Sequence, residues 1–162
     1  MVKQIDYQTA LNEYIDIIGE IEFGNHFDRT NDDHKKILNE RLEHYNQSNI
    51  LFFSAYDDES HDPCGIISIV ENQNIFHTDD CEILQIGVKN AYRKQGIGSQ
   101  LLNFITDYYK KKDYYCIFVN TYAADYKVIS FYGKNGFYPI SVIPDTNGKS
   151  DEGTIVMRKK LM

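Results

Sequence analysis

Apolar residues recur at helical spacing twice in the first third of the chain. After a short strand predicted at residues 2–7, Thr9 can cap a helix that ends at Gly19. A second helix is predicted after Asn31 or Asp32, and its inner stripe consists of Ile37, Leu38, Arg41, Leu42 and Tyr45. This part of the chain is therefore expected to be mainly helical.

The middle of the chain contains dense apolar segments typical of buried strands. Strands are predicted at residues 50–56, 65–70 and 82–88, and the polar loop 57–63 joins the first two. The third strand leads into an amphipathic helix at residues 98–112, which ends in three lysines where the helix dipole is negative.

The last third alternates strand and helix. A buried strand at residues 115–119 precedes a helix from about residue 125 to 134 that ends at Gly136. Two further strands are predicted at residues 137–143 and 154–158, and no linker-like segment or repeat interrupts the chain. The pattern predicts one α/β domain over residues 1–162, built on a mixed sheet.

Composition narrows the class of protein. Of the 162 residues, 42% are hydrophobic and 14% aromatic, which excludes a disordered or collagen-like chain. No apolar run approaches a membrane span and the start lacks a signal region, so we expect no membrane partner and a cytoplasmic location. The net charge of -7 argues against a nucleic-acid partner.

The cysteines and histidines predict neither a disulfide framework nor a metal site. The three cysteines Cys64, Cys81 and Cys116 lie beside or within apolar runs, which is typical of reduced, buried side chains. The five histidines never fall at ligand spacing with a carboxylate or thiol. We therefore expect no metal.

The segment 93–99 holds the most informative pattern in the chain. Gly96 and Gly98 lie between a strand and a helix, and Arg93 and Lys94 add positive charge just before them. A helix start leaves several backbone N–H groups without intrahelical partners, so such a turn can hold a phosphate group. No Gly-Lys-Ser/Thr follows and Leu101 stands where a third glycine would be needed, so neither a nucleotide-hydrolysing loop nor a dinucleotide fingerprint is present.

Two segments together resemble the GNAT superfamily of acetyl-CoA-dependent N-acetyltransferases. Arg93, Gly96 and Gly98 match that family's R/Q-x-x-G-x-G/A motif. Residues 131–137 match its F-Y-x-x-x-G-F segment, in the family's order and at a typical separation. The resemblance spans roughly a third of the chain and implies a mixed, mostly antiparallel sheet of about six to seven strands flanked by about four helices.

The resemblance also implies a site for acetyl-CoA. Backbone N–H groups of Gln95, Gly96, Ile97, Gly98 and Ser99 would bind the pyrophosphate of CoA, with Arg93 and Lys94 beside them. The strand end at Ile86, Gly87 and Val88 would pair with the pantetheine arm, although Gly87 is also explained as a simple strand-end glycine. Many relatives carry an asparagine that contacts the pantetheine; here Asp125 stands at that position and Asn120 lies further back, so both are candidates. The position of Asp125 favours a role as a helix cap over a contact with pantetheine.

Two residues are candidates for acid and base catalysis. An alkyl ammonium must lose its proton before it can attack a thioester, and Glu82 corresponds to the general base of the family's histone-modifying branch. Other branches use a chain of water molecules, in which case Glu82 is a surface carboxylate. Tyr132 matches the tyrosine that protonates the departing CoA thiolate, although a tyrosine beside Ile129 and Phe131 can also be core.

The sequence thus predicts an enzyme that moves an acetyl group from acetyl-CoA to a primary amine by direct attack. A non-catalytic acyl-CoA binding module is the alternative. The sequence does not identify the acceptor, which could be a polyamine, an aminoglycoside, another small amine or a peptide amine. Aromatic and acidic residues between the first two helices, among them Glu20, Phe23, Phe27 and Asp28, favour a cationic small molecule, although a solvated acidic face explains them too. Relatives also allow a homodimer.

Overall fold

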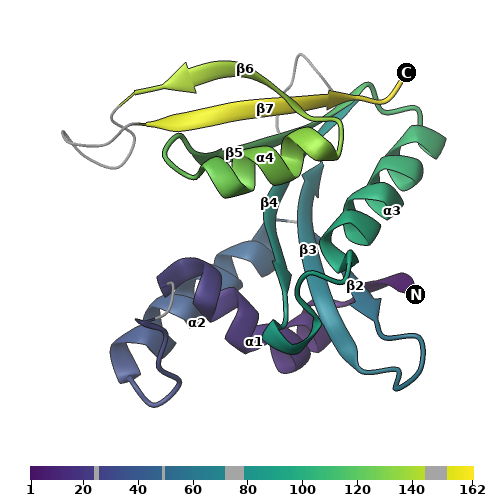
Figure 1. Ribbon diagram of the computed structural model, residues 1–162. Helices are drawn as coiled ribbons and strands as arrows, with labels where there is room; N and C mark the ends of the chain where they lie inside the picture. The colour runs from purple at the N-terminus through teal and green to yellow at the C-terminus, as the bar shows by residue number, and fades with distance from the viewer. Residues whose placement is uncertain (24–25, 49, 72–78, 145–152) are drawn as a thin grey trace. The chain divides into compact units, whose positions relative to one another are not determined.

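The computed structural model describes residues 1–23, 26–48, 50–71, 79–144 and 153–162. It contains a seven-stranded sheet in the order β1-β2-β3-β4-β5-β7-β6 (Figure 1). The chain divides into two compact units, one formed by residues 1–70 and 85–101 and the other by residues 71–84 and 102–162. The elements are β1 (Val2–Ile5), α1 (Tyr7–Phe23), α2 (Asp32–Gln47), β2 (Leu51–Tyr56), β3 (Pro63–Glu71), β4 (Asp80–Val88), the short 3-10 helix η2 (Asn90–Tyr92), α3 (Ile97–Lys111), β5 (Cys116–Tyr122), α4 (Tyr126–Lys134), β6 (Tyr138–Ile143) and β7 (Thr154–Lys160).

The predicted fold class is confirmed, and the predicted elements are all present with ends that differ by a few residues. The start of the first helix was predicted wrongly. The backbone N–H of Thr9 donates to the carboxylate of Asp6 at 2.8 Å, so Asp6 rather than Thr9 caps α1. Helix α2 is capped by Asn31, whose side chain accepts hydrogen bonds from the N–H groups of Asp33 and His34.

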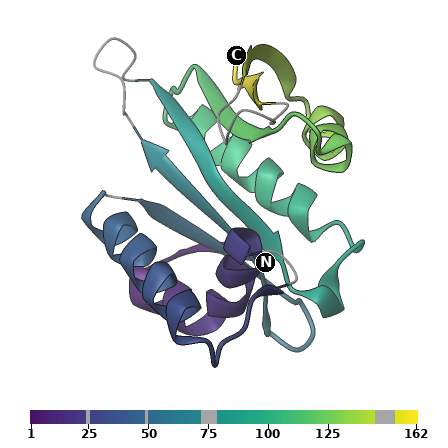
Figure 2. The same cartoon turned by 90° about the vertical axis from the view of Figure 1, so that its left-hand side faces the viewer.

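In the first unit, strands β1, β2 and β3 form an antiparallel meander with helices on both faces. Figures 1 and 2 show α1 and α2 next to each other against these strands. Tyr14 of α1 contacts Ser54 on one face. On the other, a side chain at Gly65 would collide with Ile97 and Leu101 of α3. Because Gly65 is paired with Ala55, the neighbour of Ser54, the two contacts lie on opposite faces of the sheet.

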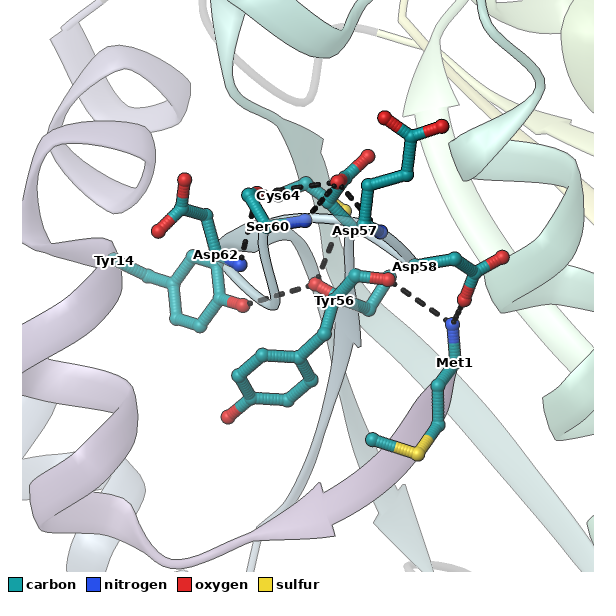
Figure 3. A network of polar contacts seen from close by, with 10 residues as sticks. Met1, Tyr14, Tyr56, Asp57, Asp58, Ser60, Asp62 and Cys64 are labelled. Atoms are coloured by element: carbon teal, nitrogen blue, oxygen red, sulfur yellow. Dashed lines mark hydrogen bonds and ion pairs between the residues drawn. The ribbon is translucent and has the colours of Figure 1, made fainter.

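A polar network ties α1 and β1 to the β2–β3 hairpin (Figure 3). The fully buried Tyr14 hydroxyl is within hydrogen-bonding distance of Ser54, and the thiol of Cys64 donates to the Ala55 carbonyl at 3.1 Å. At the hairpin end, the carboxylate of Asp57 accepts from the N–H of Ser60 at 2.8 Å. The bonds of Tyr14 and Cys64 satisfy polar groups that burial would otherwise leave unpaired.

In the second unit, the beginning of β4 runs parallel to β5, and β7 lies antiparallel between β5 and β6. One face of this sheet is apolar: Ile117, Val119 and Met157 are at most 2% exposed. Helix α4 lies on that face, because a side chain at Gly136, just after the helix, would contact Lys159 two residues from Met157. Figure 1 shows α4 along β5, β7 and β6. The opposite face therefore carries Phe118 and the residues paired with it, Glu82 and Arg158.

Several other predictions can be compared with the structure. Cys64, Cys81 and Cys116 are free and buried, as predicted. No helix in the described ranges is long and apolar enough to cross a bilayer. The prediction of a single domain remains a prediction. Strand β6 is exposed along its whole length, at the edge of the sheet.

Candidate functional site

The turn between β4 and α3 has a backbone shape that depends on glycine. Lys94 and Gly96 have φ values of 64° and 84°, in the left-handed region that favours glycine. The N–H of Gln100 donates to the Gly96 carbonyl at 2.9 Å, which makes this the first bond of helix α3. The N–H groups of residues 97–99 therefore have no acceptor within their own helix.

The surroundings of these amides suit an anion. The first turn of α3 contains no acidic residue, and the positive end of the helix dipole lies there. A side chain added at Gly96 would meet no atom within 4 Å, so the space beside the turn is open. Lys94, Gln95 and Gly96 are exposed, while Ile97, Gly98 and Ser99 are half-buried. The turn thus fits a phosphate group of the kind that CoA carries.

Arg93 has a structural role that the sequence did not indicate. Its Nε donates to the Val88 carbonyl at 3.0 Å, and its Nη2 forms an ion pair with Glu20 of α1 at 2.8 Å. The side chain therefore fixes the end of β4 to the turn and to the first helix. Because Glu20 lies 73 positions away in the sequence, no local pattern could have revealed this pair.

Gly87 is explained by packing. A side chain at this position would collide with Ile17 of α1, which is only 4% exposed. The close approach to β4 at this glycine is therefore made by a helix of the same unit. This contact accounts for the glycine without a ligand, and a role of Gly87 toward pantetheine stays a prediction.

Pairing between β4 and β5 stops before either strand ends. The register runs from Asp80 opposite Cys116 to Ile83 opposite Val119, whereas β4 continues to Val88. Ile86, Gly87 and Val88 are half-buried. Residues 84–88 are therefore not part of the register found with β5 among the described residues.

Glu82 and Asn120 are brought together in the second unit. The side-chain amide of Asn120 donates to the Glu82 carboxylate at 2.7 Å. Burial raises the pKa of Glu82, and the nearby carboxylate of Asp80 raises it further, whereas the Asn120 hydrogen bond lowers it. Burial is the largest of these effects. The result is a carboxylate more basic than an ordinary surface glutamate, as a general base requires.

Tyr132 is buried on α4, with 4% of its surface exposed. Its ring contacts Phe137 edge-on, with centroids 5.4 Å apart. Burial raises the pKa of its hydroxyl, so the group stays protonated at neutral pH. Within the described part of the chain this hydroxyl makes no hydrogen bond, so its proton is free for another acceptor. Tyr132 lies on the α4 side of the sheet and Glu82 on the opposite side, because Glu82 is paired with Phe118.

Asp125 caps helix α4. Its carboxylate accepts a hydrogen bond from the N–H of Val128 at 3.0 Å. This confirms the capping interpretation, and a contact of Asp125 with pantetheine is a further prediction. Asn120 already has Glu82 as its partner.

The acidic residues near the first two helices are largely occupied by local contacts. Glu20 pairs with Arg93, Asp28 accepts from Thr30 at 2.7 Å, and Asp32 pairs with Lys35 at 3.0 Å. Phe23 stacks on His34 with centroids 4.3 Å apart. The side chain of Glu22 and residues 24–25 lie outside the described residues. Local partners therefore account for these three carboxylates without a bound cation.

The described residues contain no cluster of histidine, cysteine or carboxylate side chains suited to a metal ion.

In the comparison with curated proteins, the chain resembles an uncharacterized N-acetyltransferase, YobR, from Bacillus subtilis, at 29% identity over 90 residues. The match covers 56% of this chain but 34% of that relative, so the chain spans about a third of the length of the curated protein it matches.

Solved structures share the fold over nearly the whole chain. A chimera of the spermidine N-acetyltransferase SpeG from Vibrio cholerae and hSSAT superposes with a TM-score of 0.74 at 14% identity, over 99% of this chain and 95% of that one. An aminoglycoside 6'-N-acetyltransferase complexed with coenzyme A gives 0.73 at 16% identity, over 100% and 97%. An acetyltransferase from Bacillus subtilis in complex with CoA gives 0.71 at 19% identity, over 99% and 98%.

A family sequence model provides the remaining comparison. The model of the acetyltransferase (GNAT) family matches residues 12–137. This range includes the β4–α3 turn, the Glu82–Asn120 pair and Tyr132. Since the match extends over most of the chain and the solved relatives share its fold, this protein belongs to the acetyltransferase (GNAT) family.

Proposed function

We propose that the protein is an N-acetyltransferase that moves an acetyl group from acetyl-CoA to a primary amine by direct attack in a ternary complex. The observation that carries this proposal is the β4–α3 turn. Its left-handed Gly96, open surroundings and amides without helical partners fit a diphosphate. Two solved relatives were crystallised with CoA, which supports the same co-substrate.

The first unit would hold the CoA moiety. Backbone N–H groups of residues 95–99 bind the pyrophosphate, and Lys94 adds a screened positive charge beside them. Residues 86–88 of β4 pair with the pantetheine, in line with the short β4–β5 register. Asn120 and Asp125 are the remaining candidates for this contact. CoA supplies the acetyl group as a thioester.

Glu82 would deprotonate the acceptor. An amine with a pKa near 10.4 needs about 4 to 5 kcal/mol to lose its proton at neutral pH. A carboxylate whose pKa is raised by burial accepts this proton more readily than an ordinary surface glutamate does, and the nitrogen then has the lone pair with which it attacks. Asn120 would hold the Glu82 carboxylate in place for this transfer.

Tyr132 would protonate the sulfur. As the new C–N bond forms and the C–S bond breaks, the thiolate takes a proton, and an unpartnered phenol can donate it. The ammonium proton passes to Glu82 before the attack, and the second proton of the attacking nitrogen passes to solvent as the amide forms. The Tyr132 phenolate regains a proton from solvent, so charges and protons balance with one net proton released. The raised pKa of Tyr132 keeps this proton in place until the sulfur departs.

The acceptor that we propose is a small amine. Spermidine and aminoglycosides appear in the names of solved relatives, which favours a cationic acceptor. A homodimer is also proposed. The exposed edge strand β6, with Val142 56% exposed, supports it, and light scattering tests it.

The decisive experiment combines calorimetry with a thiol-release assay. Titration with CoA is expected to give saturable heat, and acetyl-CoA with an amine panel is expected to release free thiol faster than hydrolysis alone. Binding without turnover for any amine would instead establish the non-catalytic acyl-CoA binding module. No heat with CoA would overturn both functions.

A further inference from the structure

One row of side chains crosses the sheet of the second unit on the face away from α4. Glu82 of β4 is paired with Phe118 of β5, Phe118 with Arg158 of β7, and Arg158 with Tyr138 of β6. Directly paired residues point to the same face of a sheet. A carboxylate, an aromatic ring and a guanidinium therefore lie in order across three neighbouring strands.

Arg158 is held by a neutral partner. Its Nε and Nη2 donate to the hydroxyl of Tyr138 at 3.2 and 3.0 Å, and its guanidinium lies 5.5 Å from the centre of that ring. Among the described residues no carboxylate lies within ion-pair distance of it. Nη1 and the second N–H of Nη2 are thus available to a further acceptor. A guanidinium fixed by a phenol is preorganised for a carboxylate or phosphate, which it binds through two parallel N–H groups.

The spacing of the row indicates the length of a ligand that could lie along it. Neighbouring strands lie about 4.8 Å apart, so the backbones at Glu82 and Arg158 are separated by roughly 10 Å. Phe118 is half-buried between them and its aromatic side chain can contact an apolar chain. The row therefore provides a site for an ammonium, an apolar contact and a site for an anion, in that order.

We propose that the acceptor is an amine that carries an anionic group, a carboxylate or a phosphate, about 10 Å from the reacting nitrogen. Arg158 binds the anion and Tyr138 positions Arg158. This inference rests on the proposed function, because it assigns the amine to Glu82. It narrows the small amine of the proposed function to one that carries a negative charge in addition to its ammonium group.

The test compares three amines of equal length. 8-Aminooctanoate carries an anion at the far end, octylamine carries no charge there, and 1,8-diaminooctane carries a cation. We expect kcat/KM of the wild-type protein to fall in that order. 8-Aminooctyl phosphate then shows whether a carboxylate or a phosphate is preferred.

Substitution of Arg158 links this preference to the row. Arg158→Gln should lower kcat/KM for 8-aminooctanoate about tenfold, mainly through KM, since a charge-assisted hydrogen bond is worth about 1.5 kcal/mol or more. The value for octylamine should not change. Lys160→Gln removes the same charge from an exposed position on the same strand and should leave the ranking intact. Tyr138→Phe should reduce the preference less than Arg158→Gln does.

Several results would overturn the inference. They are a wild-type preference for octylamine or 1,8-diaminooctane, an equal loss for all three amines in Arg158→Gln, or a loss of preference in Lys160→Gln. Direct calorimetric titration of the protein with 8-aminooctanoate decides the question without turnover: binding must be seen and must weaken about tenfold in Arg158→Gln. If no amine is acetylated but this binding holds, the proposed function fails and the anion site stands.

Discussion

The β4–α3 turn and the Glu82–Asn120 pair would contribute to the proposed function in different ways. The turn offers backbone N–H groups, and its shape depends on one glycine with a φ of 84°. The pair consists of two side chains from different strands, joined by a hydrogen bond of 2.7 Å. In the turn, chemistry follows from local conformation, whereas in the second unit it follows from strand pairing.

This difference determines which changes affect each region. A backbone site tolerates many side chains but not a lost glycine, because the N–H groups remain whatever the side chains are. A side-chain site tolerates changes around it but not in it. Substitutions should therefore separate CoA binding from chemistry.

The largest effect is expected at Tyr132. Tyr132→Phe removes only the hydroxyl, and loss of a general acid costs about a hundredfold or more in kcat. Because that hydroxyl makes no hydrogen bond to the described residues, the melting temperature and the affinity for CoA should stay unchanged. Steady-state kinetics measures the loss in kcat, and calorimetry measures the affinity for CoA.

Tyr109→Phe is the matched control. Tyr109 of α3 is fully buried, and its hydroxyl also lacks a hydrogen-bond partner among the described residues. Its loss should leave kcat unchanged. Equal rates in Tyr132→Phe and the wild type would show that Tyr132 is only part of the core.

The next largest effect is expected at Gly96. Gly96→Ala forces a side chain into a left-handed conformation at a cost of about 1 to 2 kcal/mol, although the space around it is open. A turn that relaxes to avoid this cost moves its amides, so CoA affinity should fall about tenfold while kcat at saturation changes little.

Gly133→Ala provides the comparison for this prediction. Gly133 also has open space around it but lies within α4 at a helical position. The same substitution there should stabilise the protein by up to about 1 kcal/mol and leave CoA affinity alone. Unchanged CoA affinity in Gly96→Ala would show that the β4–α3 turn does not bind CoA.

Much of the fold was predictable because its signals are local. The apolar stripe of α3 and the dense strands β2 to β5 can be recognised within a few residues of sequence. Helix ends were less certain: Thr9 and Asp6 are both good caps, and only the packed structure selects Asp6. The motif of residues 93–99 indicated the turn, since glycine there reports a backbone requirement.

The remaining features of the candidate site depend on contacts between distant segments. Gly87 suggested a close approach, but not that Ile17 makes it. Arg93 was predicted to serve an anion, and its bonds to Val88 and Glu20 arise from tertiary packing. Neither the bond between Asn120 and Glu82 nor the row to Arg158 could be predicted without the strand register.

A smaller effect is expected from the bond between Asn120 and Glu82. Asn120→Leu keeps the size of the side chain but removes the donor that lowers the pKa of Glu82. That pKa should rise, so less of the base is ionised at acidic pH. The acidic limb of the kcat/KM profile should therefore move to higher pH. Asn103→Leu, on the exposed side of α3, is the control. A limb that does not move would favour a water chain as the base.

The smallest effect concerns Arg93 and Glu20, which join the turn to α1. Their side chains are 51% and 37% exposed, so a double-mutant cycle with Arg93→Gln and Glu20→Gln should give a coupling below about 1 kcal/mol. Arg93→Gln should cost more stability than Glu20→Gln, because it also loses the bond to the Val88 carbonyl.

The effects of these two substitutions on the affinity for CoA should have opposite signs. Glu20→Gln removes a negative charge near the diphosphate and should tighten binding a few-fold at low salt, whereas Arg93→Gln should weaken it. Both changes should shrink at high salt, since these charges are exposed to screening. Effects of the same sign would mean that the pair acts through the fold of the turn rather than through its charge.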